Sequence, residues 1–268
     1  MKKELVNNYL KTIGYFDEIV NIDDINKLMR AHVNTFAFSS LKVLLKEDIS
    51  LDLEDIYESI VLKKRGGYCF EHNKLFYEVL KSLGFDVVYY LARVVNNMDN
   101  IVPQTHRFTL LNYKNEQYLL DVGIGFRTPC VAVKFGKDIS TNHLGYNFKI
   151  EKIDDNTYGL EILDKDDVFI ATKFDLNKCY EADFEMGHFY SHKNPCAVFV
   201  NNLVLSLITK DEIRSLRNSD YFKIYENAQE KIEIKSLNMF QKILKEEFNV
   251  DFQDKELELL YKEFVIEV

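Results

Sequence analysis

Apolar positions in the first third of the chain recur every three or four residues, the spacing of one buried helix face. The pattern runs from Ile25 to Phe36 behind an acidic start, again from Leu53 to Lys63, and a third time from Cys69 to Leu83. Gly84 follows the last of these segments and is a typical helix stop. Residues 1–84 are therefore predicted to form a helical module.

From residue 85 the spacing changes to the alternation of β-strands. Five segments are rich in β-branched and aromatic residues: Val87–Val95, His106–Asn112, Gln117–Val122, Phe148–Ile153 and Tyr158–Leu163. Short polar turns separate the second segment from the third and the fourth from the fifth, so we expect two hairpins.

The last third of the chain mixes both patterns. A strand-like run covers Val198 to Ile208, short strands follow near Tyr221 and Ile232, and amphipathic helices begin at Leu237 and Asp254. The order predicts an α+β protein of three consecutive modules: 1–84, 85–185 and 186–268.

Composition narrows the class of protein. The 268 residues are 47% hydrophobic and 29% charged, which is a globular balance. The net charge of -9 makes a nucleic acid an unfavourable partner. The first residues lack the apolar segment of a secretory signal, and the longest weakly charged apolar stretch, Cys196–Thr209, is too short for a bilayer. We expect a cytoplasmic protein with reduced cysteines and no membrane partner.

The segment Arg65–Asn73, RGGYCFEHN, carries the strongest chemical signal. Two glycines allow a tight turn, so that Cys69 falls in the first turn of the next helix. The positive end of the helix dipole there favours a thiolate, and Arg65 would add to that field. The alternative is a buried structural cysteine, but the glycine pair and the residues downstream favour a nucleophile.

A cysteine nucleophile needs an imidazole to accept its proton and a carboxylate to orient that imidazole. His106 begins one predicted strand, and Asp121 ends the next strand before the turn that contains Gly123 and Gly125. Taken singly, His106 could be structural and Asp121 could be a turn cap. Together with Cys69 they predict a Cys-His-Asp triad.

These motifs resemble those of the arylamine N-acetyltransferases. The resemblance is carried by RGGYCFEHN at 65–73, THR at 105–107, DVGIG at 121–125 and ARV at 92–94, with weaker similarity at Arg30-Ala31-His32, Phe38, Leu41 and 191–195. It covers most of the chain and implies a helical bundle (1–84), a β-barrel (85–185) and an α/β lid (186–268), with a cysteine-protease-like catalytic core.

The resemblance also implies acetyl-coenzyme A as co-substrate and an arylamine or arylhydrazine as acceptor. No metal is expected. It identifies Cys69 as the acetylated nucleophile, His106 as the base and Asp121 as the carboxylate that orients it. The apolar part of the substrate cleft is predicted from four residues, any of which could instead belong to the core: Phe38, Phe70, Ile124 and Phe126.

Two departures from the family pattern change the picture. The family commonly reads Phe-Glu-Asn-Leu where this chain has Phe38-Ser39-Ser40-Leu41, so a carboxylate that would support Arg65 is missing. Ile124 stands where many members have Phe, which predicts an acceptor pocket of different shape.

His188, His192 and Cys196 share a four-residue spacing, but Pro195 interrupts the helix that a metal site would need.

Two other classes of function stay open at this point. A triad alone does not separate transfer to an amine from transfer to another acceptor or to water, so a related thiol acyltransferase, amide synthase or hydrolase is possible. A catalytically silent binding module with the same fold is the third interpretation, and the complete triad argues against it.

Overall fold

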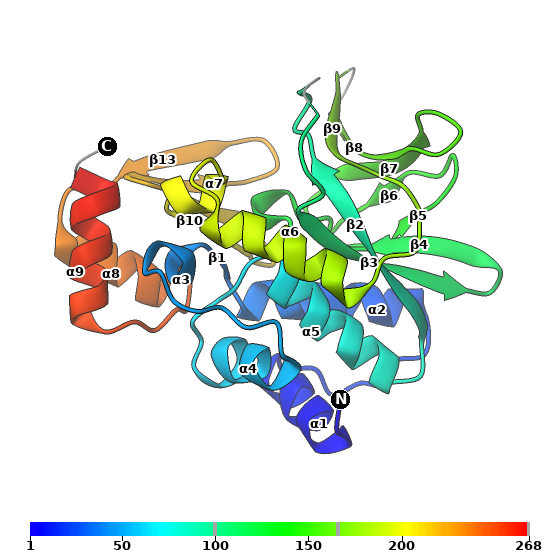
Figure 1. The fold of residues 1–268 in the computed structure, drawn as a ribbon, viewed down its shortest axis with the longest axis horizontal. Coiled ribbons are helices and arrows are strands. Elements are labelled where there is room, and N and C mark those ends of the chain that lie inside the picture. The colour runs from blue at the N-terminus through cyan, green and yellow to red at the C-terminus, as the bar shows by residue number, and fades with distance from the viewer. Residues whose placement is uncertain (99–100, 165–166, 267–268) are drawn as a thin grey trace.

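The computed structural model describes residues 1–98, 101–164 and 167–266. Helices combine with two antiparallel sheets, one of eight strands and one of five (Figure 1). The α-helices are α1 (Lys3–Thr12), α2 (Ile22–Thr35), α3 (Leu41–Leu44), α4 (Leu53–Tyr57), α5 (Cys69–Ser82), α6 (Glu181–Lys193), α7 (Val198–Asn201), α8 (Leu237–Glu246) and α9 (Asp254–Tyr261). The other helical segments are the π-helical η1 (Glu58–Leu62) and η3 (Lys262–Ile266) and the 3-10 helix η2 (Gly125–Arg127).

The three predicted N-terminal helices are confirmed. The Asn21 side chain caps α2 by accepting the backbone N–H of Asp24. The segment from Leu53 is α4 continued by η1. α5 begins at Cys69, as predicted, and Gly84 after its end has a φ of 90°, which suits glycine.

The eight-stranded sheet curves into a nearly closed barrel. Its strands are β2 (Asp86–Val94), β3 (His106–Tyr113), β4 (Glu116–Leu120), β5 (Val133–Lys134), β6 (Ser140–Thr141), β7 (Asn147–Lys152), β8 (Tyr158–Asp164) and β9 (Asp167–Phe174), in the order β5-β4-β3-β2-β9-β8-β7-β6. A bridge between Phe135 and Ile150 brings β5 close to β7 near the other edge. Both predicted hairpins, β3-β4 and β7-β8, are confirmed, while β9 was not predicted.

The five-stranded sheet joins the two ends of the chain. Its order is β1 (Phe38–Ser39), β10 (Val204–Ile208), β11 (Ile213–Arg217), β12 (Asp220–Ile224) and β13 (Gln229–Glu233). β1 therefore pairs with a strand that lies far from it in the sequence, and Phe38 stands opposite Ser206.

α6 is continuous through residue 185, the second expected module boundary, and the three-module division stays a prediction.

One expected strand is wrong in its first half. Residues 198–201 form α7, and the strand begins only at Val204. The β-branched residues of this segment favour a strand locally, but α7 packs against α3 and α6, and these tertiary contacts decide its conformation.

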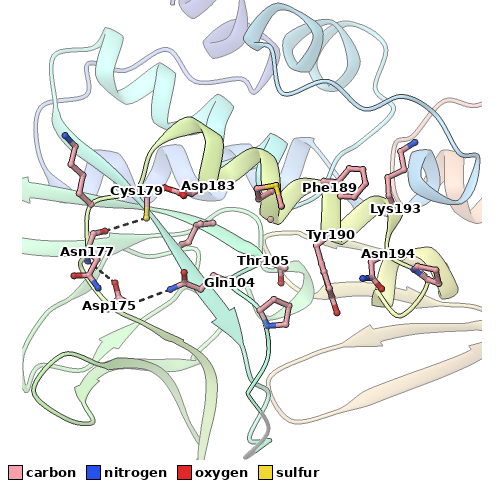
Figure 2. A pocket seen from close by; sticks show the side chains of 16 residues that line it. Gln104, Thr105, Asp175, Asn177, Cys179, Asp183, Phe189, Tyr190, Lys193 and Asn194 are labelled. Carbon is pink, nitrogen blue, oxygen red and sulfur yellow. Dashed lines mark hydrogen bonds between the residues drawn. The ribbon is translucent and has the colours of Figure 1, made fainter.

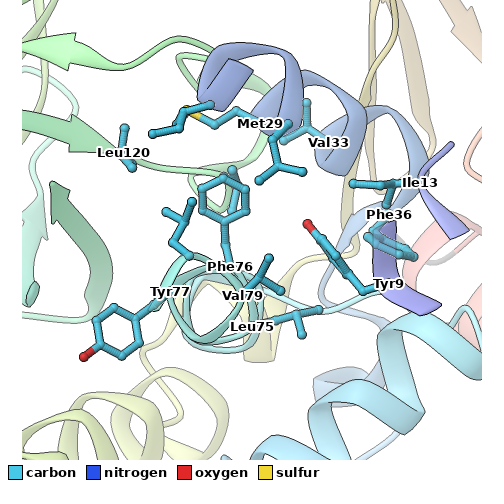
Figure 3. Close-up of a cluster of buried hydrophobic side chains, with 14 of the residues drawn as sticks. Tyr9, Ile13, Met29, Val33, Phe36, Leu75, Phe76, Tyr77, Val79 and Leu120 are labelled. Carbon is cyan, nitrogen blue, oxygen red and sulfur yellow. The ribbon is translucent and has the colours of Figure 1, made fainter. Parts of the chain in front are cut away.

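The largest apolar core lies between α1, α2, α5 and the barrel wall (Figure 3). Phe76 and Val79 of α5 point into this core together with Tyr9 of α1 and Met29 of α2, and all four are completely buried. The core fixes α5, and with it the position of Cys69, against the barrel. Within the ranges that the structure describes, none of the helices has the length and apolar character needed to cross a lipid bilayer.

Candidate active site

Cys69 lies at the first turn of α5, held there by a tight backbone turn. Gly66 has a φ of 67°, and a β-carbon on it would come within 2.7 Å of Ser39 Cβ, so only glycine fits. The Glu71 carboxylate accepts the backbone N–H of Tyr68 at 3.3 Å and forms a buried ion pair with Lys42. The Cys69 side chain is buried, and its Sγ lies 3.5 Å from the carbonyl oxygen of Thr105.

His106 and Asp121 approach Cys69 from neighbouring strands of the barrel. His106 begins β3, and Asp121 directly follows β4. His106 Nε2 donates to Asp121 Oδ2 at 2.6 Å, and the other ring nitrogen is left for its hydrogen bond with Cys69. The structure thus brings the three predicted residues together in the order that a triad requires.

Electrostatics at His106 favours the imidazolium. Burial alone would lower the pKa of His106, but the charge and hydrogen bond of Asp121, together with the contact with Cys69, raise it to about 10. Both side chains are almost fully enclosed, at 2% exposure for His106 and 1% for Asp121, so solvent screens their attraction little. A protonated His106 places a positive charge beside the Cys69 sulfur.

Asn73 is a residue of the site that sequence reasoning did not single out. It lies one helical turn after Cys69, is completely buried, and its amide contacts Asp121, Val122 and the carbonyl of Arg107. The signal that could have revealed it is its position at i+4 from the nucleophile, because such residues share one helix face.

The four predicted cleft residues divide between different surroundings. Phe38 and Phe70 belong to the same buried cluster as Cys69, and the Phe38 ring meets Phe199 of α7 at 5.6 Å between centroids. Ile124 is partly buried in the turn after Asp121, whereas Phe126 packs against the core of α1, α2 and α5. The contribution of these four side chains to substrate binding stays a prediction.

A cavity of about 740 Å³ lies beside α6, next to the site (Figure 2). Thr105, whose carbonyl contacts Cys69, lines it together with the apolar side chains of Met186 and Phe189. Lys178 and Lys193 also line this cavity together with Asp175 and Asp183, so it offers an apolar wall and charged groups of both signs.

Comparisons with known proteins place this arrangement in a family. A family model described as N-acetyltransferase matches residues 21–257. The arylamine N-acetyltransferase of Escherichia coli strain K12 is 31% identical over 256 residues, which cover 93% of this chain and 90% of that protein. The chain belongs to the arylamine N-acetyltransferase family. Its members are acyltransferases, and this protein is an enzyme of that class.

Solved structures of arylamine N-acetyltransferases share the fold. The enzyme from Salmonella typhimurium has a TM-score of 0.92 at 23% identity, covering 98% of this chain and 99% of that one. The enzyme from Mycobacterium marinum in complex with CoA has a TM-score of 0.91 at 24% identity, covering 97% and 100%. The likeness confirms the mixed helix and sheet architecture with its barrel-like sheet.

Arg65 forms ion pairs with carboxylates other than the one that the arylamine N-acetyltransferase pattern would supply. Where the pattern has a glutamate in β1, this chain has Ser39, and Arg65 instead pairs with Glu47 and with Glu256 of α9. Its two terminal nitrogens donate to Glu256 at 2.9 and 3.3 Å, and its guanidinium lies 4.2 Å from the centre of the Phe252 ring. Arg65 therefore links the turn before Cys69 to the C-terminal helices, and an effect on the thiolate stays a prediction.

The histidines of α6 have partners of their own. His188 Nε2 donates to the carbonyl of Ile49 at 2.7 Å, so its Nδ1 accepts from the Tyr68 hydroxyl. His192 stacks on His188 with ring centroids 4.2 Å apart, and Cys196 is exposed beyond the end of the helix. Across residues 1–98, 101–164 and 167–266, no three His, Cys, Asp or Glu side chains are grouped as a metal site would require.

Proposed function

We propose that this enzyme transfers an acetyl group from acetyl-coenzyme A to the nitrogen of an arylamine or arylhydrazine through an acetyl-Cys69 thioester. The observation that carries the proposal is the buried chain of contacts from Cys69 through His106 to Asp121. Membership in the arylamine N-acetyltransferase family and the CoA complex of the Mycobacterium marinum relative support the donor and the acceptor class.

In the first half-reaction, the Cys69 thiolate attacks the carbonyl carbon of the acetyl thioester. The new bond joins Cys69 Sγ to that carbon, and the bond from the carbon to the sulfur of coenzyme A breaks. The leaving thiolate takes the proton of the His106 imidazolium, which leaves a neutral imidazole beside acetyl-Cys69. The backbone N–H of Cys69 is available to the tetrahedral oxyanion, because first-turn N–H groups have no partner within their helix.

In the second half-reaction, the neutral amine attacks acetyl-Cys69 and gives its proton to His106. The bond from the acetyl carbon to Cys69 Sγ then breaks, so the products are the amide, the Cys69 thiolate and the His106 imidazolium. Asp121 stabilises the imidazolium at both stages and fixes the tautomer in which Nε2 carries a proton.

The cavity beside α6 suits the donor. It adjoins Thr105, whose carbonyl contacts Cys69, and Lys178 and Lys193 in a wall that also carries Asp175 and Asp183 can pair with phosphate groups. Met186 and Phe189 give it an apolar wall on which the uncharged parts of coenzyme A can pack.

Intact-mass measurement after mixing the enzyme with acetyl-coenzyme A alone tests the proposal. One acetyl group should appear on the wild-type protein and none on Cys69→Ser, and adding an arylamine should discharge it as the amide. Initial rates at varied donor and acceptor should give parallel double-reciprocal lines. Intersecting lines without acetyl-enzyme would indicate direct transfer, and rapid loss of the acetyl group to water would indicate a hydrolase.

A further inference from the structure

Asn73 connects the helix of the nucleophile to both partner strands of the triad. Its Oδ1 accepts the backbone N–H of Val122 at 3.0 Å. Its Nδ2 donates to the carbonyl oxygen of Arg107 at 2.6 Å and to Asp121 Oδ1 at 2.9 Å. One side chain of α5 therefore contacts the residue after His106, the residue after Asp121, and Asp121 itself.

Two backbone groups fix which way the Asn73 amide points. The N–H of Val122 can only donate, and the carbonyl of Arg107 can only accept. A flipped amide would set nitrogen against the N–H and oxygen against the carbonyl, leaving buried polar groups unpaired at a cost of about 1–3 kcal/mol each. The second hydrogen of Nδ2 is thereby directed at Asp121.

This N–H constrains the Asp121 carboxylate. Oδ1 accepts from Asn73 and from the backbone N–H of Gly123 at 2.8 Å, while Oδ2 accepts from His106 at 2.6 Å. Because two donors hold one oxygen, the carboxylate cannot rotate without losing one of them, and Oδ2 stays aimed at the imidazole. The donors also compensate for burying the charge.

We propose that Asn73 is a positioning residue that orients Asp121, and through it His106, relative to the helix that carries Cys69. This role rests on the proposed thioester mechanism, in which His106 gives a proton to the leaving coenzyme A thiolate and takes one from the amine that attacks acetyl-Cys69. Asn73 contributes by connecting α5, β3 and the turn after β4, the three elements that carry Cys69, His106 and Asp121.

A merely structural amide would stabilise the fold without affecting the triad. Asn142 is the matched control, because it is also buried and its Oδ1 accepts the backbone N–H groups of Leu144 and Tyr146 at 2.9 and 3.0 Å. It lies in the turn between β6 and β7, outside the site described above.

The experiment compares Asn73→Ala, Asn73→Asp and Asn142→Ala with the wild type. Three quantities are measured: kcat, the rate of Cys69 alkylation by iodoacetamide against pH, and the midpoint of urea unfolding. Asn73→Ala should lower kcat about 10- to 100-fold, the loss expected for one hydrogen bond to a charged group, and should shift the alkylation profile. Asn142→Ala should lower the unfolding midpoint and leave both other readouts at wild-type values.

Asn73→Asp preserves the size of the side chain but places a second carboxylate against Asp121. Like charges at this distance disfavour each other, so kcat at neutral pH should fall further than in Asn73→Ala. Part of that loss should be recovered relative to wild type in mild acid, where the introduced carboxyl takes up a proton and can donate again.

A double-mutant cycle separates a role through Asp121 from an independent one. If Asn73 acts through Asp121, then Asn73→Ala combined with Asp121→Asn should be no slower than Asp121→Asn alone. Additive losses would overturn the proposal, as would a folded Asn73→Ala with wild-type kcat and alkylation profile. If both Asn73 variants fail to fold, the residue is structural and the proposal fails. The alkylation profile needs no acetyl donor, so these outcomes are distinguishable from failure of wild-type enzyme to form acetyl-Cys69.

Discussion

Gly123 lies so close to Cys69 that a β-carbon on the glycine would come within 3.0 Å of the cysteine α-carbon. The same atom would lie 2.9 Å from Asn73 Nδ2 and 3.3 Å from His72 Cβ. The turn after β4 therefore rests directly on the first turn of α5. This contact places Asp121, two residues earlier in the chain, within hydrogen-bond distance of His106.

Gly123→Ala should separate the turn from α5. An added methyl group in such a tightly packed place typically lowers the free energy of unfolding by about 1–3 kcal/mol, because the backbone must shift to make room. Asp121 moves with the turn, so kcat should fall at least tenfold, which corresponds to about 1.4 kcal/mol. Gly159→Ala in β8 is the control, since its added carbon meets side chains alone, the end of the flexible Ile153 at 3.1 Å and Ile170 at 3.5 Å. Equal kcat in the two variants, measured on folded protein, would contradict a role for this close approach.

Cys69→Ser should abolish turnover, because a serine hydroxyl at the same place is a far weaker nucleophile at neutral pH. Cys130→Ala should stay active, since burial raises the pKa of the Cys130 thiol and holds it neutral. Cys196→Ser should also stay active, because Cys196 is exposed beyond α6. Cys179→Ser should still form acetyl-enzyme. Turnover by Cys69→Ser, with activity lost from another of these variants, would place the nucleophile elsewhere.

Asp121→Asn should lower kcat by about 10⁴, the loss seen when the orienting carboxylate of a serine-protease triad is replaced in the same way. The amide cannot favour the imidazolium as a carboxylate does, so the raised pKa of His106 should fall. Iodoacetamide alkylation of Cys69 should then require a higher pH. A folded variant with wild-type turnover and alkylation would show that Asp121 is only a turn cap.

Acid should destabilise the fold through a buried histidine pair behind the site. His72 Nε2 faces the carbonyl of Ala37 at 3.1 Å and must donate to it, so its Nδ1 accepts from His32 Nε2 at 2.8 Å. His32 Nδ1 then accepts from the Tyr9 hydroxyl at 2.8 Å. This chain of hydrogen bonds uses both rings in the neutral form.

Burial lowers the pKa of His72 from 6.5 to about 4 and places that of His32 well below its ordinary value. Between pH 6.5 and 4 the unfolded chain binds a proton that folded His72 does not, so stability is present above this window and is lost as the pH falls through it. The shift of His72 corresponds to about 3 kcal/mol. Urea unfolding from pH 7 to 4 measures the loss.

His72→Asn supplies the control for this dependence, because it removes the titrating ring. The variant should be less stable at neutral pH, but its free energy of unfolding should fall less steeply toward pH 4 than that of the wild type. Other buried histidines, including His188, contribute to the slope of both proteins. An identical slope in the two proteins would mean that His72 does not titrate as described.

Local sequence determined the elements and the chemistry. Helical periodicity and Gly84 located α5, alternation located the hairpins, and the glycine pair before Cys69 indicated that this residue begins a helix. These features depend on neighbours within a few residues, since caps, turns and amphipathic faces are short-range. Cys69, His106 and Asp121 could be proposed from the sequence because a cysteine nucleophile needs an imidazole and a carboxylate, and their catalytic roles stay predictions.

Tertiary structure alone decided what joins these elements. Arg65 is paired with Glu256 across 191 positions, and Asn73 is directed at Asp121 by backbone groups of two strands. Residues 198–201 became α7 against their local preference for a strand. Such contacts have no signature in a single sequence. They depend on which helix and sheet surfaces pack against each other, and on which buried polar groups then need a hydrogen-bond partner.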